Sequence, residues 1–202
     1  VLTETPVPVD TEKAAPLLMT AWLSRGPDQE DERLLRRLRF AGYNDIDVPA
    51  LVAVAARGRR SLSDVHLALA VAPDVQRALD RGAPDCLSVP SGRSVPLEYT
   101  SDGGVTAAVK LQELFGLGET PRLGPRRVPV LLALLAPNGR PVQLTRDLAS
   151  FWARTYPDVR RELRGRYPKH PWPEDPWTAI PTTGTTKRLA GDQTTPPGKK
   201  TR

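Results

Sequence analysis

Apolar residues in the first 84 positions recur at the three- and four-residue spacing of amphipathic helices. Aspartates stand where several of these patterns begin, and an N-cap carboxylate accepts free backbone N–H groups of a first turn. Glycines stand where most of them end. We predict five helices, from about Thr11 to Arg25, from Asp28 to Gly42, from Asp47 to Gly58, from Ser61 to Val71 and from Pro73 to Gly82.

Two of these helices carry a specific expectation. Pro16 is an awkward interior residue, so the first helix starts either after Asp10 or at Pro16 itself. Ser61 and Asp64 have the spacing of a capping box, which predicts the start of the fourth helix. The second helix has acids in its first turn and arginines in its last, as the helix dipole favours. Its predicted buried stripe is Leu34, Leu35, Leu38 and Phe40.

From Asp85 onward the period of the pattern changes to two, which is typical of β-strands. Asn138-Gly139 is a strong signal for the turn of a hairpin, and Ser91-Gly92 predicts another tight turn. Glycines and prolines from Gly116 to Pro125 indicate an irregular loop. The expected strands are Cys86–Val89, Ser94–Tyr99, Val105–Leu111, Val128–Ala136 and Pro141–Thr145.

A helix is expected after this sheet, capped by Asp147. It carries Leu148, Phe151 and Trp152, and we predict that Trp152 belongs to the core. The residues that follow, Tyr156 to Pro176, begin as a second helical pattern, with Pro157 suited to the first helical position. Gly165 is the expected stop.

Beyond Gly165 the chain is predicted to be extended. Each proline removes a backbone donor and biases the preceding residue away from the helical conformation. The prolines are Pro168, Pro171, Pro173 and Pro176. Two interpretations stand: this stretch is a strap that closes over the core, with Tyr167 and Trp172 as anchors, or it is an element that contacts phosphates.

The expected fold class is therefore α+β: an N-terminal helical array, then a small antiparallel β-sheet with hairpins, a C-terminal helix and an extended strap. The division that we predict is 1–10 as the end of a preceding domain or a linker, 11–84 as helical, and 85–176 as an α+β domain. Residues 177–202 lack the apolar content that offsets the entropy of ordering, and they are expected to be a disordered basic tail.

The net charge of +6 is unevenly distributed along the chain. Residues 1–119 hold 13 basic and 17 acidic residues, whereas residues 120–170 hold 11 basic and 3 acidic ones. Such asymmetry favours an anionic polymer as partner. Arginine suits phosphate, and exposed aromatic rings stack on bases. The candidate nucleic-acid-binding residues are Arg122, Arg126, Arg127, Arg154, Arg160, Arg161, Arg164, Arg166, Tyr167, Lys169 and Trp172. Arg160 and Arg164, four residues apart, are expected to share one helix face.

Several classes of site are disfavoured by the residues themselves. Cys86 is the only cysteine, so an intramolecular disulfide is ruled out. The sequence has only two histidines in addition, which makes a zinc cluster implausible. No phosphate-binding loop of the Gly-x-x-x-x-Gly-Lys-Ser/Thr type is present, and no apolar run has the length of a membrane span. We expect no catalytic, cofactor or metal residue in this chain, no ATP hydrolysis by it alone, no membrane partner, and a cytoplasmic location.

The chain resembles the C-terminal domain of the HrpB-type DEAH-box ATP-dependent RNA helicases, closely from about Ser88 to Pro176 and more loosely before. The motifs that carry the resemblance are Leu111–Leu117, Thr120–Arg122, Arg127–Val130, Thr145–Trp152 and Tyr156–Pro176. The resemblance implies a parent chain that hydrolyses ATP with magnesium in two motor domains, none of whose active-site motifs has a matching position here.

Two functions follow from these observations. The first is an accessory region that contacts single-stranded RNA and supports the motor domains. The second is a structural or interaction module that docks on the motor or on another protein and hardly touches RNA. A free-standing enzyme is a poor third hypothesis, because the chemistry is missing.

Overall fold

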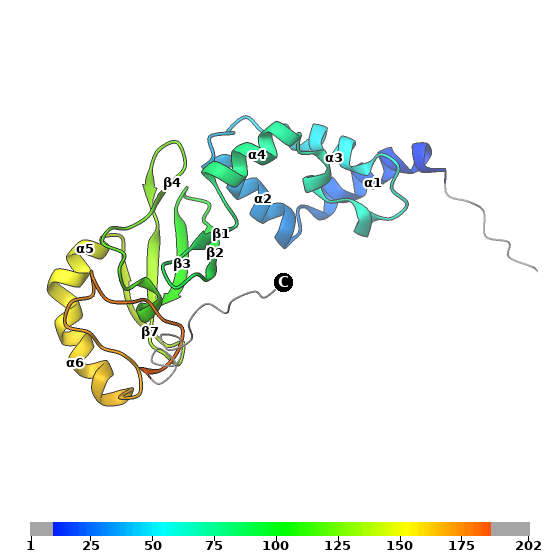
Figure 1. Ribbon diagram of the computed structural model, residues 1–202. Coiled ribbons are helices and arrows are strands. Elements are labelled where there is room, and N and C mark those ends of the chain that lie inside the picture. Colours follow the sequence, from blue (N-terminus) through cyan, green and yellow to red (C-terminus); the bar gives the residue numbers. More distant parts are fainter. Residues whose placement is uncertain (1–9, 187–202) are drawn as a thin grey trace, which may run out of the picture. The chain divides into compact units, whose positions relative to one another are not determined.

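The computed structural model describes residues 10–186 and contains two compact units, which divide between Ala83 and Pro84. The first unit is helical and the second is built on a β-sheet (Figure 1). The expected α+β class, with helices first and the sheet second, is confirmed. Within the described residues, no helix is both long enough and apolar enough to cross a membrane.

The helical unit begins with α1 (Thr11–Arg25) and α2 (Gln29–Phe40). Asp10 caps α1 by accepting from the amides of Glu12 and Lys13, so the helix starts there and runs through Pro16. Asp28 caps α2 in the same way. Because of the amphipathic pattern, α2 buries one face, and the predicted stripe is confirmed as Leu34, Leu35, Leu38 and Phe40.

Two further helices, α3 (Val48–Ala56) and α4 (Pro73–Gly82), were also predicted from the sequence. The fourth predicted helix is wrong. Two short 3-10 turns, η1 (Leu62–Asp64) and η2 (Leu67–Ala70), stand in its place, and the Ser61 hydroxyl bonds Ser63 instead of capping a helix.

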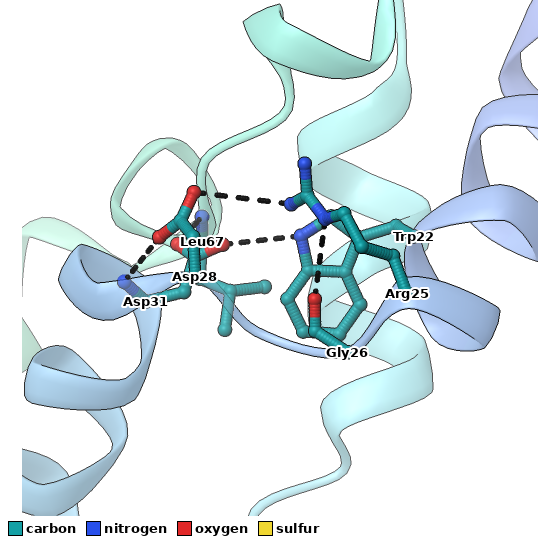
Figure 2. A network of polar contacts seen from close by, with 6 residues as sticks. All are labelled: Trp22, Arg25, Gly26, Asp28, Asp31 and Leu67. Atoms are coloured by element: carbon teal, nitrogen blue, oxygen red, sulfur yellow. Dashed lines mark hydrogen bonds and ion pairs between the residues drawn. The ribbon is translucent and has the colours of Figure 1, made fainter.

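The buried carboxylate of Asp31 explains this correction. Its Oδ1 accepts from the backbone N–H of Leu67 at 2.8 Å, which diverts that donor from a helical ladder. Its Oδ2 accepts from Nε1 of Trp22 at 3.1 Å (Figure 2). Three segments far apart in sequence, α1, α2 and η2, therefore meet at one side chain.

The second unit contains a five-stranded sheet in the order β1-β2-β3-β6-β7. Neighbouring strands are antiparallel except β3 and β6, which pair in parallel with Ala107 opposite Leu132. The turn between β6 and β7 has Gly139 at φ 84°, the left-handed conformation that the Asn-Gly signal predicts. The strands are β1 (Cys86–Ser88), β2 (Ser94–Tyr99), β3 (Val105–Lys110), β6 (Leu131–Leu135) and β7 (Pro141–Thr145).

The crossover between β3 and β6 holds a 3-10 turn, η3 (Leu111–Leu114), and a separate two-stranded hairpin of β4 (Arg122–Leu123) and β5 (Val128–Pro129). The sequence predicted one strand across Val128–Ala136. It is split, because β5 pairs with β4 while β6 pairs with β3, and the buried Val130 between them donates to the carbonyl of Pro121.

A continuous helical stretch lies along one side of the sheet (Figure 1). It consists of α5 (Leu148–Ser150), a π-helical turn (Phe151–Thr155) and α6 (Tyr156–Arg166). Gly165 was predicted to end this helix, but it lies inside. The amide of Tyr167 still donates to Leu163, and the chain leaves the helix only before Pro168.

An aromatic cluster forms the core between this helix and the crossover. Trp152 is 1% exposed, and the centroid of its indole lies 6.0 Å from Phe115, 5.1 Å from Phe151 and 5.2 Å from Tyr156. Its Nε1 donates to the carbonyl of Leu117 at 2.8 Å. The prediction that Trp152 belongs to the core is confirmed.

The strap, residues 167–176, contains no helix or strand (orange in Figure 1). Trp172 is buried in it, and the carbonyl of Pro176 accepts from Gly116. The ten residues after the strap were expected to be disordered, but one of them is held on the domain: Thr182 is buried and its amide donates to the carbonyl of Gln112. The remainder of that expected tail, 187–202, and the expected linker up to residue 9 lie outside the described residues.

Candidate nucleic-acid interface

The exposed side of α6 holds a hollow of about 680 Å³, here called the α6 hollow. Residues spaced three or four apart share one face of a helix, and this spacing places three arginines together. The residues that line the hollow are Pro157, Arg160, Arg161, Arg164, Gly165 and Pro168. No carboxylate belongs to this lining, so the hollow is cationic.

Arg160 is held by the strap. Its Nε donates to the carbonyl of Trp172 at 2.9 Å, and its Nη2 lies 3.0 Å from Oε1 of Glu174. The side chain is only 23% exposed. Arg160 and Arg164 were expected to present their charges together on one helix face. They differ in availability, because the guanidinium of Arg160 is already bonded to the strap of its own domain.

Arg161 and Arg164 are the exposed arginines of the α6 hollow. Arg161 pairs with Asp158 at 3.1 Å, but both side chains are largely in solvent, where such pairs are weak. Arg164 makes no ion pair within residues 10–186. Arg166, on the next turn, pairs with Glu162 at 3.1 Å and does not line the hollow. The cations available to a ligand are thus those of Arg161 and Arg164.

The strap candidates have different environments. Trp172 is buried and its Nε1 donates to the carbonyl of Tyr167, so its ring belongs to the packing of the domain. Tyr167 is half-buried, with its ring edge-on to His170 at 6.4 Å. Lys169 is exposed, and its carbonyl accepts from the amide of Thr186. The strap is therefore anchored by Trp172 as the sequence suggested.

A second basic group lies on the β4–β5 hairpin and beside it. Arg122, Arg126 and Arg127 are all exposed there. A smaller hollow of about 310 Å³ at the base of the hairpin is lined by Glu119, Thr120, Arg122, Arg146, Asp147 and Ala149. Sequence reasoning missed Arg146. Its only signal was its place in the basic stretch, directly before the helix cap at Asp147. Arg154, in the π-helical turn between the two groups, bonds the hydroxyl of Ser150.

Two titratable groups support this architecture. Burial raises the pKa of the Tyr156 hydroxyl well above its ordinary value, so it stays protonated and donates to the carbonyl of Pro173 at 2.9 Å. Hydrogen bonds from the Thr178 hydroxyl and then the Trp177 amide lower the pKa of Asp175, just before the end of the strap. At neutral pH the Tyr156 hydroxyl therefore fastens the strap to α6, whereas the Asp175 carboxylate holds the local turn at the end of the strap.

We predict that replacing Arg160 with alanine loosens the strap. The lost hydrogen bond to Trp172 has a charged donor, which corresponds to about 1.5–3 kcal/mol. The ion pair with Glu174 adds little, because Glu174 is 87% exposed. Chemical denaturation monitored by fluorescence measures the loss. The control is Arg161→Ala, which we expect to change the unfolding free energy by under about 0.5 kcal/mol; equal losses would contradict the anchoring role.

The observed fold defines a class of protein: an α+β chain, in which a helical unit precedes a mixed sheet flanked by one long helix. A family model named HrpB_C, described as "ATP-dependent helicase C-terminal", matches residues 52–176. The chain therefore belongs to the family of HrpB-type ATP-dependent helicase C-terminal domains. The resemblance seen in the sequence is confirmed.

A sequence comparison and a structure comparison agree with this assignment. The ATP-dependent RNA helicase HrpB of Escherichia coli K12 is 40% identical over 164 residues, which cover 80% of this chain and 20% of the relative. The crystal structure of the E. coli DExH-box NTPase HrpB matches with a TM-score of 0.74 and 29% identity, covering 89% of this chain and 26% of that one. The chain thus spans about a fifth of the length of the curated relative that it matches.

Proposed function

We propose that this domain contacts single-stranded RNA beside an ATP-dependent motor in the same polypeptide. The observation that carries the proposal is the α6 hollow, a concave surface lined by three arginines and no carboxylate. The similarity to an ATP-dependent RNA helicase supports RNA as the polymer. On this proposal ATP and magnesium belong to the motor domains, the parent chain acts in the cytoplasm, and the present domain grips the strand.

The chemistry of the hollow suits a phosphate backbone. A guanidinium presents a rigid fork of donors that matches two phosphate oxygens at once. Arg161 and Arg164 supply two such forks on successive turns of α6. Because these contacts go to phosphate and not to base edges, the proposed grip is independent of sequence, as a moving helicase requires.

The salt dependence of RNA binding tests this proposal. Each phosphate neutralised on a single strand contributes roughly −0.7 to the slope of log affinity against log salt. We expect the double variant Arg161→Ala/Arg164→Ala to flatten the slope by about 1.4 on a mixed-sequence strand. Titration of the 202-residue chain at several salt concentrations gives this quantity.

The matched control removes the same charge elsewhere. Arg77 and Arg81 are exposed residues of α4 in the helical unit, and Arg77→Ala/Arg81→Ala is expected to keep the wild-type slope. Glu162→Gln is likewise expected not to weaken binding. Equal slopes for wild type and the Arg161/Arg164 variant, measured on folded protein, would exclude the α6 hollow as the RNA contact.

The alternative function, a protein-docking module, is favoured by a different observation. The helical unit has an apolar hollow of about 360 Å³, with Tyr43 and Val54 partly exposed in its lining and with Asp45 and Asp47 as its only charged residues. Such a surface suits an apolar segment with a basic residue, and we assign that segment to the motor. If Val54→Asp released the domain from a separately produced motor while RNA binding stayed intact, docking would be the better description of this unit.

A further inference from the structure

The β4–β5 hairpin carries three exposed arginines. Its loop runs from Gly124 to Arg127, since Leu123 pairs with Val128. Arg122, Arg126 and Arg127 are all exposed, and within residues 10–186 none of them makes an ion pair with a carboxylate. The hairpin extends from the sheet at the end near α5 (Figure 1), as the hollow shared by Arg122 and Ala149 also indicates.

The backbone of the hairpin tip is unusual at Arg127. Its φ is 50°, in the left-handed region, and it is the only non-glycine residue with positive φ among those described. A glycine adopts this conformation without steric cost, whereas for an arginine the conformation is sterically unfavourable. The turn itself is closed by the backbone bond from the Arg127 amide to Gly124. The fold thus uses the backbone of Arg127 and leaves its side chain unexplained, which points to a role in contact with a ligand.

The other two arginines are oriented by neighbouring segments. Nη1 of Arg122 donates across the hairpin to the carbonyl of Arg127 at 3.4 Å. The guanidinium of Arg126 lies over the β2–β3 turn, where Gly103 leaves room: a Cβ there would stand 3.0 Å from its Nη2. Arg146 adds a fourth cation beside Arg122. Its charge contributes to the lowered pKa of Asp102, after the Thr100 and Gly104 hydrogen bonds.

Among the described residues, the carboxylates near this group form no ion pair with its arginines. Asp147 lines the hollow at the hairpin base, but its Oδ1 is occupied by the amide of Ser150 as a helix cap. Asp102 is engaged by the Thr100 hydroxyl within its own turn. Glu119 is the remaining acid in the hollow. The hairpin and its base therefore hold four arginines and three carboxylates, so one positive charge is in excess, and the guanidinium groups stay open to a ligand.

We propose that the β4–β5 hairpin is a second phosphate-contacting surface and that one RNA strand runs from it along α5 and α6 to the α6 hollow. This inference rests on the proposed function. Both surfaces lie along one helical stretch, with Ala149 beside the hairpin and Arg161 and Arg164 in the α6 hollow. At 1.5 Å per residue these positions are roughly 18–22 Å apart along the helix, so a short strand reaches one surface and a longer strand reaches both.

The double variant Arg126→Ala/Arg127→Gly tests the hairpin. With a strand of about 16 nucleotides, the long end of single-strand site sizes, we expect the salt slope to flatten by about 1.4. Arg127→Gly alone is expected to flatten it by about 0.7 while the melting temperature stays equal or rises, because glycine tolerates the left-handed backbone. Arg140→Ala, an exposed arginine of the β6–β7 turn, is the single-charge control and should leave the slope unchanged.

Strand length separates this inference from the proposed function. On the long strand, the flattening of the salt slope caused by the hairpin variant and that caused by the α6 variant should add, because one strand occupies both surfaces. A strand of about four nucleotides occupies only one surface at a time, so there the two effects should not add. A hairpin variant with the wild-type slope, beside an Arg161/Arg164 variant with a flattened one, would overturn the hairpin and leave the α6 hollow intact. A flattened slope for the hairpin variant alone would support the hairpin as an RNA contact and exclude the α6 hollow as one. No RNA binding by the wild-type chain would overturn both.

Discussion

Replacing Trp152 with alanine is expected to lower the free energy of unfolding by about 3–5 kcal/mol, the usual cost of truncating a buried aromatic residue to alanine. The indole is 1% exposed and packs against three other rings. Its Nε1 also satisfies the carbonyl of Leu117, which the variant leaves without that donor. The free energy of unfolding of a whole domain is only about 5–15 kcal/mol, so this loss is a large share of its stability.

Urea denaturation monitored by circular dichroism measures this effect, and Trp177→Ala is the matched control. Trp177 is 42% exposed on the segment after the strap, so its removal is expected to cost under about 1 kcal/mol. Similar midpoints for wild type and Trp152→Ala would show that the aromatic cluster does not hold the sheet and the long helix together.

The second large effect is expected in the helical unit, at Asp31. Its carboxylate is 2% exposed and satisfies two buried donors, the indole of Trp22 and the backbone amide of Leu67 (Figure 2). Asp31→Ala leaves both donors without that acceptor, at about 1–3 kcal/mol for each. We therefore expect a loss of several kcal/mol, and less for Asp31→Asn, whose amide oxygen still accepts.

Amide hydrogen exchange gives a local measure of this prediction. Protection of the Leu67 amide should fall in both variants. Alanine has no acceptor, and asparagine has a single oxygen that the Leu67 amide and the Trp22 indole must share. Asp74→Ala is the control: Asp74 also stands in a helix first turn but is exposed, so only a dipole contribution of up to about 1 kcal/mol is lost. Unchanged protection at Leu67 would contradict the bridging role of Asp31.

Local patterns predicted the elements whose causes are local. Asp10, Asp28, Asp47 and Asp147 were identified as helix caps, and each accepts a first-turn amide. The ranges of β2 and β7 were predicted without error. Turn residues stand beside both strands in the chain, and β2 also alternates exposed and buried residues. The basic stretch was equally visible, since charge is a property of composition.

The errors arose where a distant group competes with the local signal. Ser61 and Asp64 have the spacing of a capping box, but the carboxylate of Asp31 takes the amide of Leu67 from a segment 36 residues away. The segment after the strap is poor in apolar residues, yet Thr182 is ordered by a backbone bond to Gln112. Neither partner can be read from a window around the residue concerned.

For the candidate site, the sequence determined the family, the cationic composition and the helix that displays Arg160, Arg161 and Arg164. Only the tertiary structure decided which of these arginines is available. The strap folds back so that the carbonyl of Trp172 meets Arg160, while Arg161 and Arg164 stay in solvent. The same holds for the parallel pairing of β3 with β6, whose hydrogen bonds join residues brought together by a crossover. Spacing along a chain specifies which face of an element a residue occupies; what covers that face depends on contacts between segments that the spacing does not encode.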